Sequence, residues 1–478
     1  MFVNNWLSQR VEQSPTASAL IYDNETTTFR ELGKRVWSIA GKLQTVISPG
    51  QHVALLGENN RAMYELILAL QQIGAVTVFI NNRLTASEIN YQLEQSDTTQ
   101  LLYADNFKEL VAVLDLAQRP ALSFVSLEKL TAPAMIPNKT VSLKATASMM
   151  FTSGSTGHPK AVQQTYGNHL ASAMGTAMTN ALGVGDCWYC AVPLFHISGL
   201  SIMMRSLLFG TAVMLEQKFD AFRLGLLLTE GTITHASVVT TMLHRLLDTT
   251  SSTYRCHPAV KVVLLGGGPV TKELLAACQE RNIPVIPSYG MTETAAQAVA
   301  MPLDKVADKL GSAGLPLFQT QLRINKGTEA ADTVGDIWLK GANITPGYYG
   351  KQSTDFQNGW FRTGDVGYLD NEGFLYVKER AGDLIISGGE NIYPTEIEHV
   401  LLGHPAIKEI AVVGVPNEQW TQVPVAYIVT DKAVTEAELA HFLKNKLAKY
   451  KWPQAYYHVE KLPRTATGKI QRHLLRQQ

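Results

Sequence analysis

The sequence predicts an α/β fold with a large N-terminal region of α/β units, a small β-rich subdomain and a separate small unit at the C-terminus. Three observations lead to this prediction. The chain has 478 residues, more than one ordinary hydrophobic core holds. Short apolar runs alternate with helical patterns over most of its length, as in parallel sheets covered by helices. From about residue 310 the pattern changes to short strands between turns rich in Gly, Pro and Asn.

Composition excludes several classes of protein. The residues are 46% hydrophobic and 17% charged, which excludes a disordered or fibrous chain, and the formal net charge of zero gives no overall field that attracts nucleic acid. The longest apolar stretch, residues 199–215, is interrupted by Arg205 and Gly210, so we expect buried core and no stable membrane insertion. The start, Met1–Trp6, lacks a signal-peptide pattern, and four cysteines are too few for a disulfide framework. We therefore expect a cytoplasmic protein, with homo-oligomerisation left open.

The first 140 residues alternate between helix and strand. Thr28–Leu43 opens with a capping-box pattern, in which Thr28 is followed by Glu31, and continues at helical spacing. Residues 53–56 and Ala75–Ile80 are apolar runs typical of buried strands, and a helical pattern over Arg61–Ile73 joins them. This order predicts a parallel sheet with helices on its faces.

A second series of α/β units follows. A strand over residues 161–165 leads to a helix that Asn168 is expected to cap and that runs to about Leu182. The strand Val262–Leu265 stops in a glycine turn, and such turns lie at the carboxyl ends of parallel strands, where open α/β sheets bind ligands. Further strands are predicted over residues 211–215 and 233–237, and a helix over residues 272–281.

The β-rich subdomain has predicted strands over residues 335–339, 359–362 and 373–377. Near Arg380 the pattern changes again, and we place the domain boundary there, which gives domains of residues 1–381 and 382–478. The C-terminal unit has predicted helices over residues 394–402 and 436–447 and strands over residues 410–415 and 425–429. Its last 38 residues carry nine Lys or Arg against one acid, Glu460, which indicates a solvated basic surface or a cationic domain that closes over phosphates.

Cys187-Trp188-Tyr189-Cys190 has the spacing of a redox motif or of half a zinc site. No second pair exists, since Cys256 and Cys278 stand alone, and the flanking residues are apolar. We interpret the two cysteines as small apolar residues of a strand.

The stretch Thr152–Lys160 contains two glycines, four hydroxyl side chains and a terminal lysine. Glycines allow backbone N–H groups to close on an anion, hydroxyls add donors, and lysine adds positive charge. It is not a Walker loop, because Pro159 separates the last glycine region from Lys160. Composition alone leaves two interpretations open, a polyphosphate cradle and a flexible surface loop.

Four other stretches supply parts for handling a nucleotide. Residues 287–294 offer an aromatic ring, hydroxyl donors and the carboxylate of Glu293, and residues 361–365 present a second carboxylate, Asp365. Residues 383–391 are a strand leading into a narrow glycine turn, and residues 464–469 place Lys469 on a loop near the terminus. Each alone has an ordinary structural explanation. Together they suggest a phosphate loop, a magnesium carboxylate, a ribose carboxylate and a second lysine on a separate domain.

These motifs, in this order and over nearly the whole chain, resemble the acyl-adenylate-forming superfamily of acyl-CoA synthetases, luciferases and peptide-synthetase adenylation domains. The match of Thr152–Lys160 with Tyr289–Thr294, Thr363–Asp365 and Gly468-Lys469 is highly specific. The resemblance implies an acyl-CoA synthetase-like fold with a mobile C-terminal α+β domain. Within the superfamily, residues 163–169, 193–201 and 383–394 resemble the 2-succinylbenzoate–CoA ligases of menaquinone synthesis.

The resemblance implies a two-step reaction that uses ATP, Mg²⁺ and CoA. A carboxylate attacks the α-phosphate of ATP to give acyl-AMP and pyrophosphate, and the CoA thiol then displaces AMP. By the resemblance, Glu293 binds Mg²⁺, Thr292 binds an α-phosphate oxygen, and Lys469 bridges the carboxylate and the α-phosphate in the first step only. Tyr289 stacks on adenine, and Asp365 accepts the ribose hydroxyls with Arg380 assisting. The residues implied to bind nucleotide or CoA are Thr152, Ser153, Gly154, Ser155, Thr156, Gly157, Lys160, Gly267, Gly268, Ser288, Tyr289, Gly290, Met291, Asp365, Arg380, Gly388 and Gly389.

Lys469 is far from the loop along the chain, and the family solves this with a rotation of the small domain about the residue before Asp383. Here that residue is Gly382, where the family usually has Asp or Lys. Glycine has wide backbone freedom, so rotation is allowed. After it, Gly388 and Gly389 would line the pantetheine tunnel, where small residues let the thiol reach the acyl carbonyl.

The acid site follows from the chemistry of succinylbenzoate, which carries two carboxylates and an aromatic ring. The carboxylate that is not activated needs a cation or several donors if it is buried. Arg205 is the candidate, since it is alone in the apolar run over residues 200–208; the alternative is an arginine that reaches the surface. His196 is expected to shape the acyl entrance, or else to be a core histidine. Residues expected to complete the pocket are Ser201, Thr240, Thr241, Gly266 and Gly267.

Other activities remain open on the sequence. The same fold serves CoA ligases for another aromatic acid or a medium-chain fatty acid, carrier-protein loading domains and luciferases. A nucleotide-binding regulator without catalysis is disfavoured by the presence of both Lys160 and Lys469.

Overall fold

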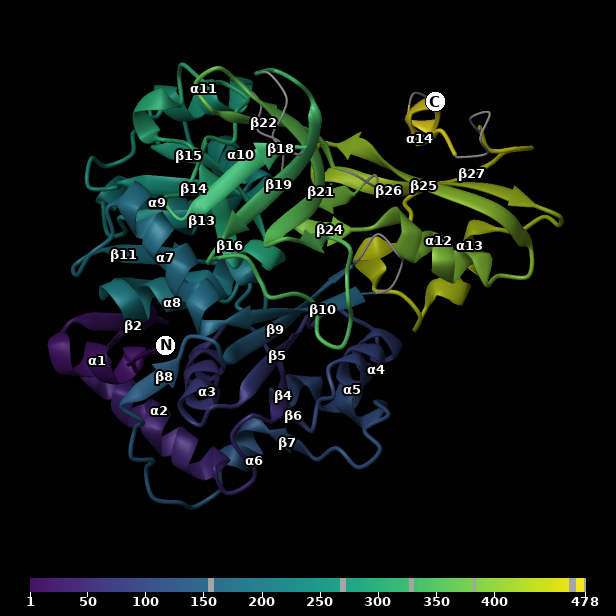
Figure 1. Cartoon of the computed structure of the whole chain (residues 1–478). Coiled ribbons are helices and arrows are strands. Elements are labelled where there is room, and N and C mark those ends of the chain that lie inside the picture. The colour runs from purple at the N-terminus through teal and green to yellow at the C-terminus, as the bar shows by residue number, and fades with distance from the viewer. Residues whose placement is uncertain (154–158, 267–271, 326–330, 381–383, 464–469, 477–478) are drawn as a thin grey trace.

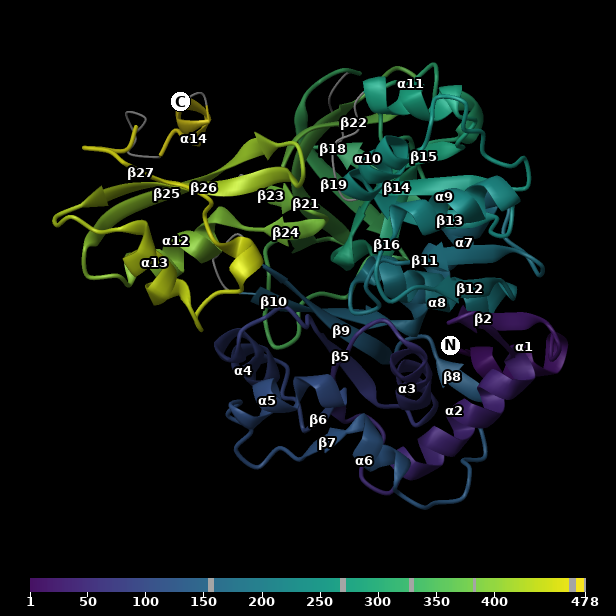
Figure 2. The same cartoon turned by 180° about the vertical axis from the view of Figure 1, so that it is seen from behind.

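The computed structural model describes residues 1–153, 159–266, 272–325, 331–380, 384–463 and 470–476. Two large sheets with covering helices make up most of the N-terminal part, a smaller antiparallel sheet adjoins them, and a fourth sheet belongs to the C-terminal part, which projects to one side (Figures 1 and 2). A short pair, β1 (Phe2–Asn4) and β8 (Thr140–Ser142), lies near the N-terminus.

The first large sheet is built from the first 165 residues. Its order is β10-β9-β5-β4-β6-β7, with parallel neighbours except for the antiparallel pair of β9 and β10. The strands are β4 (His52–Leu56), β5 (Val76–Ile80), β6 (Gln100–Tyr103), β7 (Ala121–Ser123), β9 (Thr146–Ser153) and β10 (Pro159–Thr165), and the helices are α2 (Phe29–Leu43), α3 (Arg61–Gln72), α4 (Ala86–Gln95), α5 (Lys108–Ala112) and α6 (Phe124–Glu128). The predicted capping box is confirmed, because the side chains of Thr28 and Glu31 close the start of α2 reciprocally.

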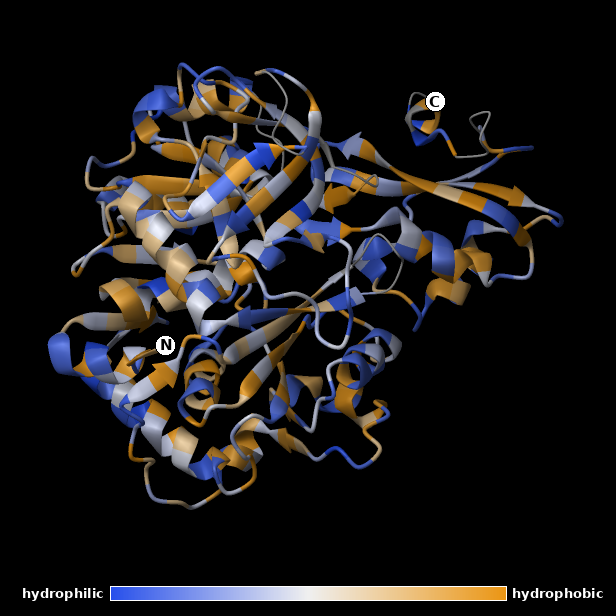
Figure 3. Ribbon diagram, viewed as in Figure 1, coloured by the Kyte–Doolittle hydropathy of each residue, from blue (hydrophilic) through white to orange (hydrophobic). Residues whose placement is uncertain are grey.

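The second large sheet has nine strands, β17-β16-β15-β14-β13-β11-β12-β2-β3, parallel from β15 to β2. The strands are β2 (Ser18–Tyr22), β3 (Glu25–Thr28), β11 (Cys187–Cys190), β12 (Ala212–Leu215), β13 (His235–Val239), β14 (Val262–Gly266), β15 (Val285–Met291), β16 (Ala296–Ala300) and β17 (Leu315–Pro316). The helices are α1 (Trp6–Gln13), α7 (Tyr166–Asn180), α8 (Ile197–Phe209), α9 (Ala221–Glu230), α10 (Thr240–Thr249) and α11 (Lys272–Glu280). The predicted parallel α/β architecture is thus confirmed, and apolar residues gather on the central strands of both large sheets (Figure 3).

Two predicted helix ends are wrong. Thr165, not Asn168, is the N-cap of α7; Asn168 is the third helical residue, and its side chain accepts a hydrogen bond from the Thr165 N–H. The Asn168 amide also donates to the carbonyls of Ala342 and Ile344, so tertiary partners select its role. In the C-terminal part, the helix predicted to reach residue 447 ends at Leu443, because Lys444 is extended and Asn445 is left-handed (φ 67°).

The third sheet is the predicted β-rich subdomain, with β18 (Thr320–Ile324), β19 (Gly335–Gly341), β20 (Phe356–Gln357), β21 (Trp360–Leu369) and β22 (Leu375–Arg380). The fourth sheet contains only residues from Ile385 onward. Its strands and helices are β23 (Ile385–Ser387), β24 (Glu390–Ile392), α12 (Pro394–Leu402), β25 (Ile407–Asn417), β26 (Thr421–Thr430), α13 (Glu436–Leu443), the 3-10 turn η4 (Lys449–Lys451), β27 (Tyr456–His458) and α14 (Arg472–Leu475).

The cysteine pair is structural, as predicted. Cys187 and Cys190 lie at the two ends of the buried strand β11, three residues apart, so their side chains point to opposite faces of the sheet. Both are free thiols, and burial raises the pKa of each to about 12. The apolar stretch around Arg205 forms α8 and β12 in the core, and no helix of the described residues is long and apolar enough to cross a membrane.

Candidate active site

The predicted phosphate loop joins two antiparallel strands. In the register of β9 and β10, Ser153 faces Pro159 and Thr152 faces Lys160, so the hairpin holds the two ends of the loop together. Residues Gly154, Ser155, Thr156 and Gly157 lie outside the described residues, as does the side chain of Ser153. The Lys160 ammonium lies 4.8 Å from the ring centre of Tyr348 and 3.9 Å from a carboxylate oxygen of Asp355.

Glu293 lies beside Thr152, at the start of this loop, and its binding of Mg²⁺ stays a prediction. Its buried carboxylate accepts hydrogen bonds from the Thr152 hydroxyl at 3.2 Å and from the Tyr348 hydroxyl at 3.1 Å. Burial and the neighbouring Glu293 carboxylate raise the pKa of Tyr348, which therefore remains a proton donor. The residue before Glu293, Thr292, is held in place by Gln164, whose side-chain amide donates a hydrogen bond to the Thr292 backbone carbonyl at 3.4 Å.

Glu293 fits a magnesium site in which the nucleotide supplies most ligands. No group of three or more His, Cys, Asp or Glu suited to a metal occurs in the part of the chain that the structure describes. Mg²⁺ at nucleotide sites commonly takes one or two carboxylates and completes its shell with phosphate oxygens and water. One buried carboxylate beside the predicted phosphate loop is therefore enough as the protein ligand of such a site.

Tyr289 and Asp365, the two residues predicted to bind the nucleoside, are hydrogen-bonded to each other. The Tyr289 hydroxyl donates to the Asp365 carboxylate at 2.7 Å, and both side chains are buried. Tyr289 follows Ser288, whose hydroxyl donates to the carbonyl of Leu265 at the end of β14. Asp365 faces Arg380 in the register of β21 and β22, while the Arg380 side chain lies outside the described residues. Adenine stacking and ribose binding stay predictions.

Gly290 and Met291 complete that strand end. A side chain on Gly290 would overlap the backbone of Ala296 on the adjacent strand, so glycine is required there by close approach of two strands. The Met291 N–H donates to the Thr294 hydroxyl at 2.9 Å, which shapes the short turn that carries Glu293. Gly267 and Gly268 lie outside the described residues.

The C-terminal part contributes the turn between β23 and β24. Gly388 and Gly389 are both left-handed, with φ of 59° and 87°. A Cβ on Gly389 would lie 3.2 Å from a methyl group of Val239, which ends β13 beside the start of α10. Gly389 therefore faces the N-terminal part at the carboxyl edge of its second sheet, whereas a Cβ on Gly388 would meet the Trp420 ring of the C-terminal part at 2.8 Å.

His196 also meets this turn. Its Nε2 lies 3.3 Å from the buried carboxylate of Glu390, and the Arg83 guanidinium lies 3.3 Å from the same group. Burial raises the pKa of Glu390, but His196 and Arg83 outweigh burial and hold it below its ordinary value. His196 is thus at the junction of the two parts and is not enclosed in the core.

Arg205 is 1% exposed, so the alternative of an arginine reaching the surface is wrong. Its guanidinium stacks 4.7 Å from the ring centre of Trp188, and one Nη lies 3.5 Å from the side-chain oxygen of Gln297. Nε and the other Nη have no hydrogen-bond partner among the described residues. Burial lowers the pKa of Arg205 to about 9, which leaves it cationic at neutral pH.

The Gln297 side chain adds one further unused hydrogen-bond donor beside Arg205. The side-chain oxygen of Gln297 already accepts a hydrogen bond from the Thr176 hydroxyl at 2.8 Å. The Gln297 Nε2 has no hydrogen-bond partner among the described residues. Gln297 and Thr176 were missed in the sequence, because each is an ordinary polar residue far along the chain from Arg205. A buried cation with spare donors, and with no carboxylate paired to it in the described ranges, is a site suited to an anionic group.

The other predicted acid-site residues are placed as follows. Ser201 lies one turn before Arg205 on α8, and its hydroxyl donates to the Ser198 carbonyl at 3.0 Å. Thr240 and Thr241 begin α10, and Gly266 faces Val239 in the register of β13 and β14. Thr240, Thr241, Gly266 and Gly389 therefore share the carboxyl edge of the second sheet.

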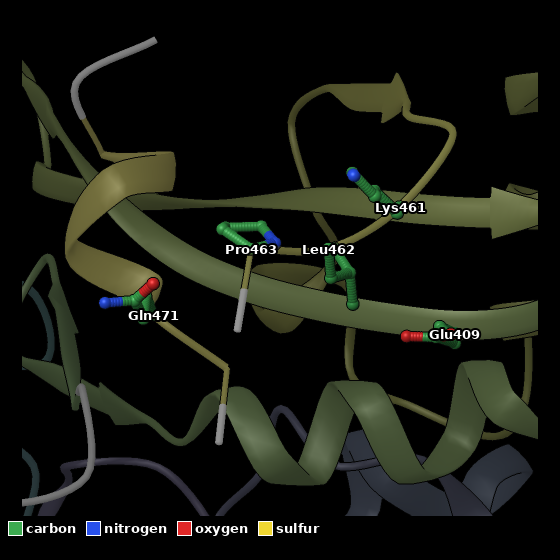
Figure 4. A pocket seen from close by; sticks show the side chains of 5 residues that line it. All are labelled: Glu409, Lys461, Leu462, Pro463 and Gln471. Atoms are coloured by element: carbon green, nitrogen blue, oxygen red, sulfur yellow. The ribbon is translucent and has the colours of Figure 1, made fainter. Parts of the chain in front are cut away.

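A separate hollow of about 450 Å³ lies on the C-terminal part (Figure 4). Its lining comes entirely from that part: Glu409, Lys461, Leu462, Pro463 and Gln471. None of these residues belongs to the predicted site. Lys469 and Gly382 lie outside the described residues.

The sequence matches the AMP-binding enzyme family over residues 7–349 and the C-terminal domain of AMP-binding enzymes over residues 396–469. The chain belongs to the AMP-binding enzyme family. It is 48% identical to a 2-succinylbenzoate–CoA ligase of Listeria monocytogenes serotype 4b (strain F2365), with 99% of each chain covered.

Two solved structures of one enzyme match this chain to different degrees. The chain matches a double mutant of o-succinylbenzoate CoA synthetase from Bacillus subtilis, bound with a product analogue, with a TM-score of 0.94, 40% identity, and coverage of 100% of this chain and 99% of that one. The same enzyme in complex with ATP and magnesium ion gives a TM-score of 0.76 at the same identity and coverage. The two parts of this chain are therefore arranged more as in the product-analogue complex.

Proposed function

We propose that this chain catalyses the ATP-dependent ligation of 2-succinylbenzoate to CoA, a step of menaquinone biosynthesis, through an acyl-adenylate intermediate. Full-length likeness to 2-succinylbenzoate–CoA ligases supports the reaction. The observation that carries the choice of acid is Arg205, a buried guanidinium with unused donors and no carboxylate partner among the described residues. A second carboxylate on the substrate supplies the missing partner.

In the first step, the carboxylate to be activated attacks the α-phosphate of ATP and pyrophosphate leaves. Thr152 and Lys160, with the loop between them, hold the departing phosphates, and Thr292 holds an α-phosphate oxygen. Glu293 holds Mg²⁺, which when bound offsets the charge of the phosphate oxygens. Tyr348 fixes the Glu293 carboxylate and lies under Lys160. Asp365, held by Tyr289, accepts the ribose hydroxyls.

In the second step, the CoA thiol attacks the acyl carbonyl and AMP leaves. Gly388 and Gly389 line the path of the pantetheine chain, and at Gly389 a Cβ would crowd Val239 of the N-terminal part. We place the boundary between residues 1–381 and 382–478, with rotation about Gly382 bringing Lys469 to the site for the first step. A Lys469→Ala variant should therefore lose acyl-AMP formation by roughly 10² or more while still transferring a supplied acyl group to CoA.

We also propose the binding partners of the enzyme and its location in the cell. The partners are the small acid, ATP and CoA, with no nucleic acid and no stable membrane insertion, and the enzyme acts in the cytoplasm. Both proposed half-reactions use residues of one chain, so a homo-oligomer is compatible with the function and is not required by it.

The test is a panel of carboxylic acids with ATP, Mg²⁺ and CoA, in which AMP and acyl-CoA are both measured. We expect 2-succinylbenzoate to give the highest kcat/KM, with benzoate and medium-chain fatty acids far lower. Equal or better use of an acid without a second carboxylate would replace the proposed substrate by that acid.

A further inference from the structure

A buried lysine joins the two parts of the chain. Lys451, in η4, lies 2.7 Å from a carboxylate oxygen of Glu88 on α4 and 2.6 Å from one of Glu396 on α12. The side chains of Lys451, Glu88 and Glu396 are 6%, 11% and 7% exposed, respectively. Lys451 belongs to the basic C-terminal stretch, for which the sequence indicates a solvated surface or a cationic domain that closes over phosphates, so its burial between two carboxylates is a feature of the tertiary arrangement.

The two ion pairs of Lys451 differ in one respect. Glu396 and Lys451 belong to the same part, where their chain neighbours Ile397 and Trp452 pack in one hydrophobic cluster, so their pair survives a rotation of that part as a rigid body. Glu88 belongs to the N-terminal part, and its contact with Lys451 exists only in an arrangement like this one. Burial lowers the pKa of Lys451, but Tyr450 and the two carboxylates outweigh burial and raise it, so the lysine is a cation.

Apolar contacts surround the same junction. Ala448 is buried in the cluster of the first large sheet, which includes Leu84, just before α4, and Ile89 on α4. Tyr450 packs against both that cluster and the cluster of the C-terminal part. Water is therefore largely excluded around Lys451, which strengthens its charge contact with Glu88 relative to a surface pair.

We infer that Glu88 and Lys451 form a latch that holds the arrangement in which Gly389 faces Val239, the one used for transfer to CoA. The inference rests on the proposed two-step function. Because the proposed function assigns the two half-reactions to different arrangements of the two parts, the latch acts on the second step alone. Glu88 is a positioning residue, since it touches neither substrate nor the reacting atoms.

Glu88→Gln isolates the latch. One Glu88 oxygen accepts hydrogen bonds from the Thr85 N–H and hydroxyl, both at 2.8 Å, as the capping box of α4. Glutamine preserves this cap, since Gln also serves at that position of a capping box, but it removes the charge that meets Lys451. The variant should therefore fold as the wild type does.

The assay measures the two half-reactions separately in single turnovers of the full chain. We expect Glu88→Gln to form acyl-AMP within about twofold of the wild-type rate. Transfer from supplied acyl-AMP to CoA should slow about tenfold, the effect of losing one hydrogen bond to a charged group. Glu94→Gln, an exposed glutamate on the same helix, is the matched control and should leave both steps unchanged.

A merely structural role would slow both steps equally, and that result overturns the latch. Unchanged transfer, or a loss confined to acyl-AMP formation, overturns it as well. The comparison runs with whichever acid the wild type adenylates best. If the preferred acid is not 2-succinylbenzoate, the proposed substrate is wrong, but the comparison of the two steps still tests the latch.

Discussion

Replacing Arg205 by methionine should separate substrate recognition from stability. Methionine is apolar and of similar length, so Arg205→Met removes the charge without opening a large cavity. The unused Nε and Nη groups are available for hydrogen bonds to a carboxylate. Loss of charged hydrogen bonds in this buried site should cost about 3 kcal/mol of transition-state binding, or roughly 150-fold in kcat/KM for 2-succinylbenzoate.

The stability of the ligand-free protein should not fall with Arg205→Met, in contrast to its activity. Burial lowers the pKa of Arg205, which means that the fold disfavours its charged form when no anion is present. An apolar residue in place of an uncompensated buried charge is commonly neutral or stabilising, although the contact with Trp188 is lost. We therefore expect the unfolding temperature of Arg205→Met without ligand to stay the same or rise.

The assay compares kcat/KM for 2-succinylbenzoate and benzoate in the wild type and in Arg205→Met, with thermal unfolding as the control. Benzoate lacks the second carboxylate, so its kcat/KM should change little. Equal losses for both acids would refute the assignment of Arg205 to the second carboxylate. A large fall in unfolding temperature would instead make Arg205 a structural residue.

Three further predictions concern the nucleotide, the thiol path and the metal. Tyr289→Phe removes the donor that faces Asp365 and should raise the KM for ATP about tenfold, measured by pyrophosphate release; an unchanged KM would count against Asp365 as the ribose acceptor. Gly389→Ala should slow transfer to CoA about tenfold and spare acyl-AMP formation, because φ is 87° there and a Cβ crowds Val239; a faster or unaffected transfer step contradicts the tunnel. Glu293→Gln should raise the Mg²⁺ concentration for half-maximal adenylation at least tenfold, and a Mg²⁺ titration that matches the wild type would remove Glu293 as the ligand.

Short-range patterns predicted most of the fold. The capping box at Thr28, the strands at residues 53–56 and 262–265, and the helix over residues 394–402 all depend on neighbours within a few residues. Hydrophobic periodicity and turn chemistry act at that range, so the sequence carries them openly. Asn168 shows the limit of such patterns, since its amide partners are Ala342 and Ile344, far along the chain.

For the candidate site too, the sequence predicts some features and leaves others to the tertiary structure. The residue types and order of Thr152, Lys160, Glu293 and Asp365 are enough to indicate adenylate chemistry, because each motif is local. Their mutual contacts were not predictable: Tyr348 under Lys160 and Gln297 beside Arg205 are common residue types with no local signature. Only the packed sheets bring them within hydrogen-bond distance.

The sequence by itself therefore determined the α/β class, the phosphate-loop composition and the family, since these depend on residue type, spacing and order. The tertiary structure alone decided that Arg205 is buried with unused donors, that Glu390 meets His196, and that Lys451 lies between Glu88 and Glu396. The physical reason is that burial and charge pairing depend on which surfaces meet. Residues hundreds of positions apart become partners only when the two parts of the chain pack together.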